Sequence, residues 1–191
     1  MKKSLSCFCL ATLVAAGFTG ANAPVTEQSV VAKPQRDYAH VRVAFTPGDN
    51  ISGIINEEIR GAKLNVRMHA YLFTSKSIAD ALVAALKRGI HVEIILDATE
   101  FENGSAPVVP RLAHAGAKIF LNSRQKSSHN KIVIIDAELP RAIVITGSYN
   151  FTRAAETQNA ENVVVLSGNT EVTQRFFKNW EFHRTRSTLL Q

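Results

Sequence analysis

Four polar residues at two places in the sequence carry side chains that could together act on a phosphate group. His129 and Lys131 stand two apart where a run of β-branched apolar residues begins, and Ser148 and Asn150 stand two apart just after a second such run. Runs of this kind are typical of buried strands, and residues two apart on a strand project from the same face. An imidazole can attack phosphorus or move a proton, while an ammonium, a hydroxyl and an amide can bind phosphoryl oxygens. The sequence therefore predicts that two strands deliver a phosphoryl-transfer set to one place.

The spacing of these residues resembles a family signature. The pattern H-x-K-x-x-x-x-D followed by G-S-x-N is that of the phospholipase D superfamily, and it stands here as His129, Lys131, Asp136, Gly147, Ser148 and Asn150. Three wider stretches resemble the small secreted bacterial endonucleases of that superfamily: Arg67–Tyr71, Ala81–Gly89 and Ala154–Val165. The resemblance implies a phosphodiester hydrolase with a phospholipase D-like fold.

The residues of the signature can be given roles in phosphodiester cleavage. His129 would be the nucleophile and form a phosphohistidine that water later opens. Lys131 and Asn150 would hold the non-bridging oxygens, with Ser148 assisting, although a turn hydroxyl is the plainer interpretation of that serine. No His, Cys or Asp cluster has convincing metal-ligand spacing, so we predict a reaction that needs no metal and no cofactor.

Only one H-x-K motif occurs in the chain, whereas larger members of the superfamily carry two. A second copy must then supply the other half of the site, and a two-fold homodimer would bring both motifs together. The partner's His129 would protonate the leaving oxygen and then activate water. The resemblance implies the same assembly.

Other residues near the signature have weaker assignments. Glu161 is the candidate to orient His129, since the resembling nucleases pair a glutamate at this position with the motif histidine; a surface strand residue is the alternative. Asp136 lies an odd number of residues after Lys131, so it points away from the phosphate and is interpreted as structural, as is Gly147. Three basic residues could contact a nucleic-acid backbone, or simply keep their loops soluble: Arg124, Lys126 and Arg153. The remaining histidines are interpreted as structural or merely exposed: His40, His69, His91, His114 and His183.

The start of the chain has the features of a Sec-type signal peptide. Two lysines precede a short apolar run, Leu5–Phe18, and Ala21-Asn22-Ala23 fits a cleavage site after Ala23. The apolar run is too short to span a bilayer core of about 30 Å. We predict residues 1–23 as signal peptide, 24–40 as flexible N-terminus and 41–191 as the nuclease domain, located in the periplasm or secreted.

The composition is compatible with an anionic partner. The chain has 191 residues, a one-domain length, and its net charge is +6. Removing Lys2 and Lys3 with the signal leaves 20 basic and 16 acidic residues, a net charge of +4. Both cysteines, Cys7 and Cys9, fall inside the predicted signal, so the mature chain would contain none.

Apolar periodicity and turn residues predict an α/β fold: a mixed, mostly parallel sheet flanked by helices. Strands are expected at 41–45, 64–73, 90–96, 117–121, 129–135, 142–146 and 161–166. Helices are expected after Asn50 or Ser52, after Ser75 or Ser77, over Val108–Ala115, and from Asn169 or Thr170 to about residue 182.

The sequence favours a secreted, metal-independent endonuclease that cleaves DNA, with RNA as a second candidate, and that has low sequence specificity. A phospholipase or cardiolipin hydrolase is the enzymatic alternative, because the same site splits lipid phosphodiesters. No amphipathic, aromatic-rich helix suited to a membrane surface occurs, and no stable membrane insertion is expected. A catalytically silent DNA-binding or conjugation accessory protein is the third alternative, although such a protein would not need His129.

Overall fold

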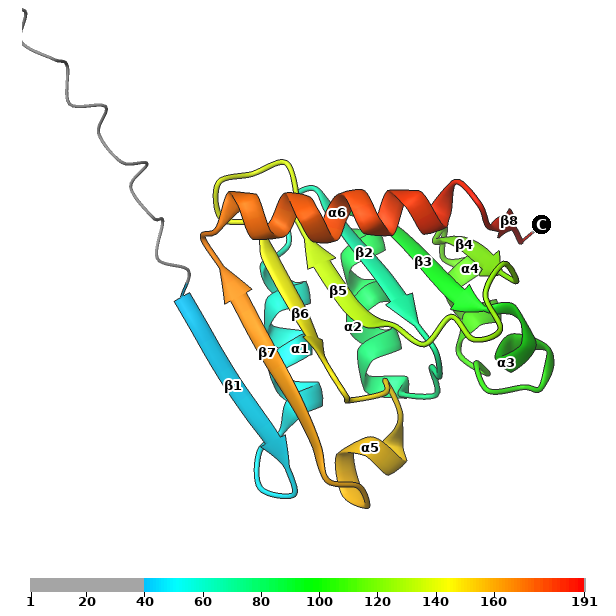
Figure 1. Cartoon of the computed structure of the whole chain (residues 1–191), viewed down its shortest axis with the longest axis horizontal. Helices are drawn as coiled ribbons and strands as arrows, with labels where there is room; N and C mark the ends of the chain where they lie inside the picture. Colours follow the sequence, from blue (N-terminus) through cyan, green and yellow to red (C-terminus); the bar gives the residue numbers. More distant parts are fainter. Residues whose placement is uncertain (1–39, 191) are drawn as a thin grey trace, which may run out of the picture. The chain divides into compact units, whose positions relative to one another are not determined.

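An eight-stranded sheet with helices on both faces organises the molecule (Figure 1). The computed structural model describes residues 40–190. The strands are β1 (His40–Thr46), β2 (Asn65–Ala70), β3 (His91–Asp97), β4 (Lys118–Asn122), β5 (Lys131–Ile135), β6 (Ile143–Gly147), β7 (Glu161–Ser167) and β8 (Thr188–Leu189). The helices are α1 (Ile51–Gly61), α2 (Lys76–Lys87), α3 (Ala98–Glu102), α4 (Val109–His114), α5 (Arg153–Thr157) and α6 (Thr170–Arg184). The predicted signal peptide lies outside the described residues.

The strand order is β1-β7-β6-β5-β2-β3-β4-β8. The pairs β2/β3 and β3/β4 are parallel, and the other five pairings in this sheet are antiparallel. The predicted mixed α/β class is confirmed, but the expectation of mostly parallel pairing was wrong. In the first half of the chain, helices connect the parallel strands β2, β3 and β4. From β4 to β7 each connection reverses the chain direction, and α6 then crosses the sheet from β7 to β8. β1 pairs with β7 at the far edge.

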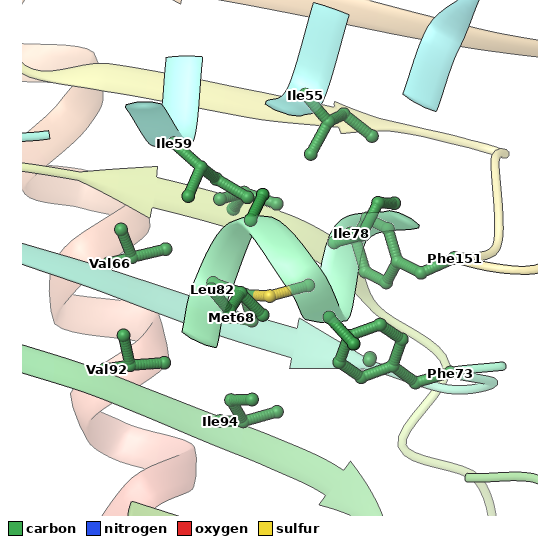
Figure 2. Close-up of a cluster of buried hydrophobic side chains, with 14 of the residues drawn as sticks. Ile55, Ile59, Val66, Met68, Phe73, Ile78, Leu82, Val92, Ile94 and Phe151 are labelled. Atoms are coloured by element: carbon green, nitrogen blue, oxygen red, sulfur yellow. The ribbon is translucent and has the colours of Figure 1, made fainter. Parts of the chain in front are cut away.

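The sheet buries one face under α1 and α2. Figure 2 shows this core, in which isoleucines and leucine from the two helices pack on the central strands: Ile55, Ile59, Ile78, Leu82, Val66, Met68, Val92 and Ile94. Phe73 and Phe151 close the same core at the end that carries the polar motif, with their ring centroids 6.0 Å apart. Residues at i, i+3 and i+4 on each helix face the sheet, as the apolar periodicity predicted.

The other face is covered by α6, which packs on β4, β5 and β6 (Figure 1). Trp180 of α6 is fully buried, and its indole nitrogen donates a hydrogen bond of 2.8 Å to the carbonyl of Met68. The side chains around it form a small second core: Ile95, Phe120, Ile132, Ile134 and Val144. At the sheet edge formed by β1, the side chains of Val41, Val43 and Phe45 face solvent, with 60%, 54% and 55% of their surfaces exposed.

Short polar side chains begin the long helices where the sequence predicted caps. Asn50 accepts from the backbone nitrogen of Gly53 at 2.7 Å, and Ser75 accepts from that of Ile78 at 3.4 Å. Asn169 caps α6 in the same way, through Val172 at 2.9 Å. The sequence did not predict α3, α5 or β8, because elements of two to five residues are too short to show periodicity. Across residues 40–190, none of the helices combines the length and apolarity that crossing a membrane requires.

Candidate active site

The predicted nucleophile and its lysine partner contact each other. Lys131 begins β5. The sequence predicted His129 on the same strand, but it lies in the loop just before it. The ammonium nitrogen of Lys131 nevertheless lies 3.0 Å from Nδ1 of His129 and 2.8 Å from its carbonyl oxygen. The His129 side chain is exposed, while Lys131 is 7% exposed. The pair thus presents an accessible imidazole held by a buried cation.

This contact selects one form of the His129 ring. A protonated lysine can only donate, so Nδ1 accepts and the neutral imidazole carries its proton on Nε2. Attack through Nε2 requires the opposite tautomer, with the proton on Nδ1. The ring therefore needs a hydrogen-bond acceptor at Nδ1, in place of the lysine donor, before Nε2 can act as the nucleophile.

Tyr71 forms one wall of the site, and sequence reasoning gave it no role. Its ring centroid lies 4.4 Å from that of His129, with the planes inclined at 52°, and the Lys131 nitrogen lies 4.9 Å from the Tyr71 centroid. The Tyr71 hydroxyl donates to Glu100 at 3.1 Å. A cation near an aromatic face is attracted to it, so Tyr71 positions both members of the pair.

Ser148 and Glu161 form a second polar cluster beside the first. The Ser148 hydroxyl donates to Glu161 Oε2 at 2.6 Å, and Asn159 donates to Oε1 at 2.9 Å. The predicted hydrogen bond between Glu161 and His129 is not formed within residues 40–190 of a single chain. Glu161 instead fixes the serine, whose hydroxyl oxygen also accepts from the backbone nitrogen of Asn162 at 3.1 Å.

Gly147 is required because β7 approaches β6 closely at this point. A Cβ on Gly147 would lie 2.1 Å from the carbonyl oxygen of Asn162. The same carbonyl accepts the backbone N–H of Ser148 at 3.1 Å. Any side chain at position 147 would push the serine out of place, which explains the glycine of the signature.

Lys131 links the two clusters electrostatically. Burial lowers the pKa of Lys131 to about 8, and the nearby Glu161 carboxylate opposes this shift. β-Sheet register supports the proximity, since Lys131 pairs with Ala70 and Glu161 pairs with Thr46 at the same ends of their strands. Lys131 is therefore charged at neutral pH but becomes neutral only slightly above it.

Asn150 lies just after β6 and is half-buried. Its carbonyl oxygen Oδ1 is buried and has no hydrogen-bond partner among the described residues. A buried amide left unpaired in this way costs free energy unless an outside group completes its bonding. Since Oδ1 only accepts, a hydrogen-bond donor such as a side chain from a second copy could complete its bonding, whereas a phosphoryl oxygen could bind only to the amide nitrogen.

Asp136 lies away from this cluster and acts on the backbone. Its carboxylate accepts from the backbone nitrogens of Lys63, Leu64 and Asn65 at 2.8, 2.7 and 3.0 Å. Its φ of 53° turns the chain out of β5. These are the contacts of a structural residue.

The three flanking basic residues are all exposed. Arg124 and Lys126 lie in the loop between β4 and β5, and Arg153 begins α5. Arg153 also borders a cavity of about 360 Å³ with Lys76 and Glu156. Their exposure leaves them accessible to a large anionic ligand.

Known proteins resemble this chain in sequence. Residues 55–183 match the family described as "Cardiolipin synthase, PLD-like domain". The chain belongs to the phospholipase D superfamily. A protein named phospholipase D from Rickettsia bellii is 33% identical over 153 residues, which cover 80% of this chain and 73% of that protein. A mitochondrial cardiolipin hydrolase from Chlamydomonas reinhardtii is 29% identical over 60% of this chain and 50% of its own length.

Solved structures of the phospholipase D superfamily have the same fold. Nuc from Salmonella typhimurium, a phospholipase D family member, matches with a TM-score of 0.72 and 32% identity, covering 81% of this chain and 99% of Nuc. NucT from Helicobacter pylori matches with a TM-score of 0.70 at 21% identity, over 80% of this chain and all of NucT, and shows the fold alone. As a member of the superfamily, the chain is a phosphodiester hydrolase.

Proposed function

We propose that this phospholipase D family member is an endonuclease that cleaves DNA, with RNA as a second substrate, and that works as a homodimer without a metal ion. The observation that carries the proposal is the exposed His129 held by Lys131 beside the Ser148–Glu161 pair. The match to nearly all of Nuc supports an activity that this domain can carry. The exposed Arg124, Lys126 and Arg153 support a long anionic substrate, because backbone contacts give affinity without sequence readout.

The chemistry proceeds in two displacements. Nε2 of His129 attacks phosphorus, and the bond to the leaving ester oxygen breaks as that oxygen takes a proton from His129 of the partner subunit. The phosphoryl group is now bonded to the His129 nitrogen. The partner's His129 then removes a proton from water, whose oxygen attacks phosphorus and releases the imidazole. Lys131 and Asn150 stabilise the charge on the non-bridging oxygens in both steps.

The need for a second copy follows from the ring of His129. One chain supplies one imidazole to a reaction that uses both a nucleophile and an acid. It also leaves Nδ1 accepting from Lys131, the tautomer that cannot attack through Nε2. Glu161 of the partner subunit is the carboxylate we assign to accept from Nδ1 and reverse the tautomer. This step would form the glutamate–histidine pair that one chain does not make.

A strip of apolar side chains next to the site is the surface we assign to the dimer. Val43 pairs with Val164, and Phe45 pairs with Asn162, whose backbone and side chain contact Ser148. We call Val41, Val43, Phe45, Val164 and Leu166 the β1–β7 strip. Exposed apolar strips of this kind mark interaction surfaces. A second copy seated on this strip would lie beside the site that it completes.

The curated relatives favour a second candidate, a lipid phosphodiesterase, because their names are phospholipase D and cardiolipin hydrolase. The experiment incubates purified residues 24–191 in excess EDTA with supercoiled plasmid, and separately with vesicles of phosphatidylcholine and cardiolipin. His129→Ala is the control in both arms. We expect nicked and linear DNA from the wild type only. Headgroup release without DNA cleavage would replace the nuclease by the lipid enzyme, and cleavage that needs added metal would refute the phosphohistidine route.

Export of the chain is also proposed, on the signal-like sequence of residues 1–23. Expression of the whole chain in a Gram-negative host should give periplasmic protein that begins at Pro24. Intact-mass measurement of the periplasmic fraction tests this. Cytoplasmic protein that retains Met1 would contradict it.

A further inference from the structure

A second histidine lies directly behind the loop that carries His129. His69 is in β2 with 0% of its surface exposed, and it pairs across the sheet with Ile95 and Ile132. These two isoleucines pack with Trp180 of α6, so His69 projects to the face that α6 covers. Sequence reasoning interpreted His69 as a structural or exposed residue. The structure shows a buried ring with specific contacts.

The ring of His69 bonds to both chain neighbours of His129. Its Nε2 lies 2.6 Å from the hydroxyl oxygen of Ser128, and its Nδ1 lies 3.3 Å from the side-chain amide nitrogen Nδ2 of Asn130. Nδ2 can only donate, so Nδ1 of His69 accepts. The neutral ring then carries its proton on Nε2 and donates it to Ser128. Each ring nitrogen of His69 has one matched partner on the loop.

Asp97 and Lys131 hold the same loop. The backbone nitrogen of Ser128 donates to Asp97 at 2.7 Å, and Asp97 also caps α3 through Glu100 at 2.9 Å. Lys131 projects to the face of α1 and α2, because it pairs with the buried Ala70. His69 and Lys131 therefore fix the segment 128–130 from opposite faces of the sheet.

The surroundings of His69 keep its ring uncharged. Burial is the main cause that lowers the pKa of His69 to about 3, and His183 and Lys131 lower it further while Asp97 opposes them. The His183 ring stands edge-on at 5.1 Å. A charged ring would donate from both nitrogens, and the bond from Asn130 would be lost. A permanently neutral ring keeps one donor and one acceptor in place.

We propose that His69 is a positioning residue that sets the place of the His129 ring by holding Ser128 and Asn130. The inference rests on the proposed role of His129 as nucleophile. A packing role would need only the volume of the ring. The observed pairing of one donor with one acceptor, on the two residues that flank His129, is what a positioning role requires. Displacing a reacting group by about 1 Å can cost on the order of 100-fold in rate, so such a support would matter for the reaction.

The test replaces the ring with ones of graded hydrogen-bonding ability. His69→Phe keeps an aromatic ring and removes both bonds, whereas His69→Gln offers a donor and an acceptor again. Ser128→Ala removes one bond without touching the ring. His183→Phe is the matched control, the same substitution 5.1 Å away in the same layer. Turnover is measured with bis(p-nitrophenyl) phosphate, a small diester that avoids the choice between DNA and lipid.

We expect kcat to fall by roughly 10- to 100-fold in His69→Phe with KM little changed, because the rate depends on placement. In Ser128→Ala kcat should fall less than in His69→Phe, and in His69→Gln part of the lost kcat should be recovered. The effects of His69→Phe and Ser128→Ala should be non-additive in the double variant, because both remove the same bond. His183→Phe should keep kcat within about twofold. An unchanged kcat in folded His69→Phe, or an equal fall in His183→Phe, would overturn the proposal. If His69→Phe does not fold, Ser128→Ala alone tests the proposal: an unchanged kcat in that variant would overturn it.

A readout without turnover separates this inference from the proposed function. Long-range proton–nitrogen spectra of protein labelled in histidine should show His69 neutral, with its proton on Nε2. The ring signals of His129 should shift in Ser128→Ala and stay in place in His183→Phe. Unmoved His129 signals would refute the positioning role even in an active enzyme. A wild type that cleaves no diester but shows these shifts would refute the proposed function and leave the positioning role standing.

Discussion

The two faces of the sheet are built in different ways. Under α1 and α2 the buried side chains are almost all apolar, and they form one continuous core (Figure 2). Under α6 the core is small, it contains the buried His69, and it gives way to the exposed β1–β7 strip. The difference teaches that the α1/α2 face supplies most of the apolar core, whereas the candidate active site draws on both faces. This site lies at the edge where the faces meet, with Lys131 on the α1/α2 face and His69 on the α6 face.

The largest expected effect is at that edge. His129→Ala should reduce diester cleavage by about 10⁴-fold or more, because the covalent step has no other nucleophile. The side chain is exposed, so the melting temperature should change little. Single-turnover cleavage together with thermal unfolding measures both. His91→Ala, another exposed histidine, is the control; full activity in His129→Ala would remove the covalent mechanism.

A change in the core under α1 and α2 should lower stability and leave activity nearly unchanged. Leu82→Ala removes a fully buried side chain and should destabilise the protein by about 2–5 kcal/mol through lost contacts and a cavity. At temperatures where the variant is folded, kcat should stay near that of the wild type. Urea denaturation and steady-state kinetics measure the two quantities. A stable variant with a large fall in kcat would mean that the two faces are not separable.

The β1–β7 strip tests the other side of the comparison. Val43→Glu places a charge on a side chain that is 54% exposed in the single chain, so the unfolding free energy should change by less than about 1 kcal/mol. If the strip is the dimer surface, the variant should sediment as a monomer and lose cleavage. Leu189→Glu, which is 51% exposed on the far edge strand β8, should keep both properties. A Val43→Glu protein that remains dimeric and active would place the interface elsewhere.

The smallest expected effect is the pH dependence of activity and stability that Lys131 causes. Since the pKa of Lys131 is lowered to about 8, its charge is lost above that pH, and kcat/KM should fall about tenfold per pH unit there. A bound anionic substrate favours the charged lysine, so the corresponding fall in kcat should begin at a higher pH than the fall in kcat/KM. In the unfolded chain the lysine keeps its proton longer. Stability should therefore rise with pH from about 8 up to the usual lysine pKa. Lys131→Met should abolish that rise, and a rise that survives would assign it to another group.

Much of the site was readable from the sequence because it is local. His129 and Lys131 are two residues apart, and their contact needs only the short turn into β5. The helix caps at Asn50, Ser75 and Asn169 are equally local, since each bonds to a backbone nitrogen three residues later. The role of Asp136 also followed from strand alternation, although its three backbone partners lie 71 to 73 residues away.

Long-range pairings could not be read in this way. The strand–helix alternation of the first half suggested mostly parallel pairing, yet five of the seven pairings are antiparallel, and β1 lies at the opposite edge beside β7. Nothing in the spacing of His69 indicated its bonds to Ser128 and Asn130, which lie 59 and 61 residues on. Glu161 looked like the partner of His129 but bonds Ser148, because β6 and β7 are neighbours in the sheet.

The sequence by itself determined the candidate reacting groups: their residue types, their places at strand ends, and the single H-x-K motif of the chain. Those facts depend on residue type and on spacings of a few residues, where backbone geometry leaves little freedom. Only the tertiary structure decided what supports the reacting groups. Burial makes His69 neutral and lowers the pKa of Lys131, and strand order sets which side chains meet. Burial and strand order both arise from contacts between distant segments, which no local pattern encodes.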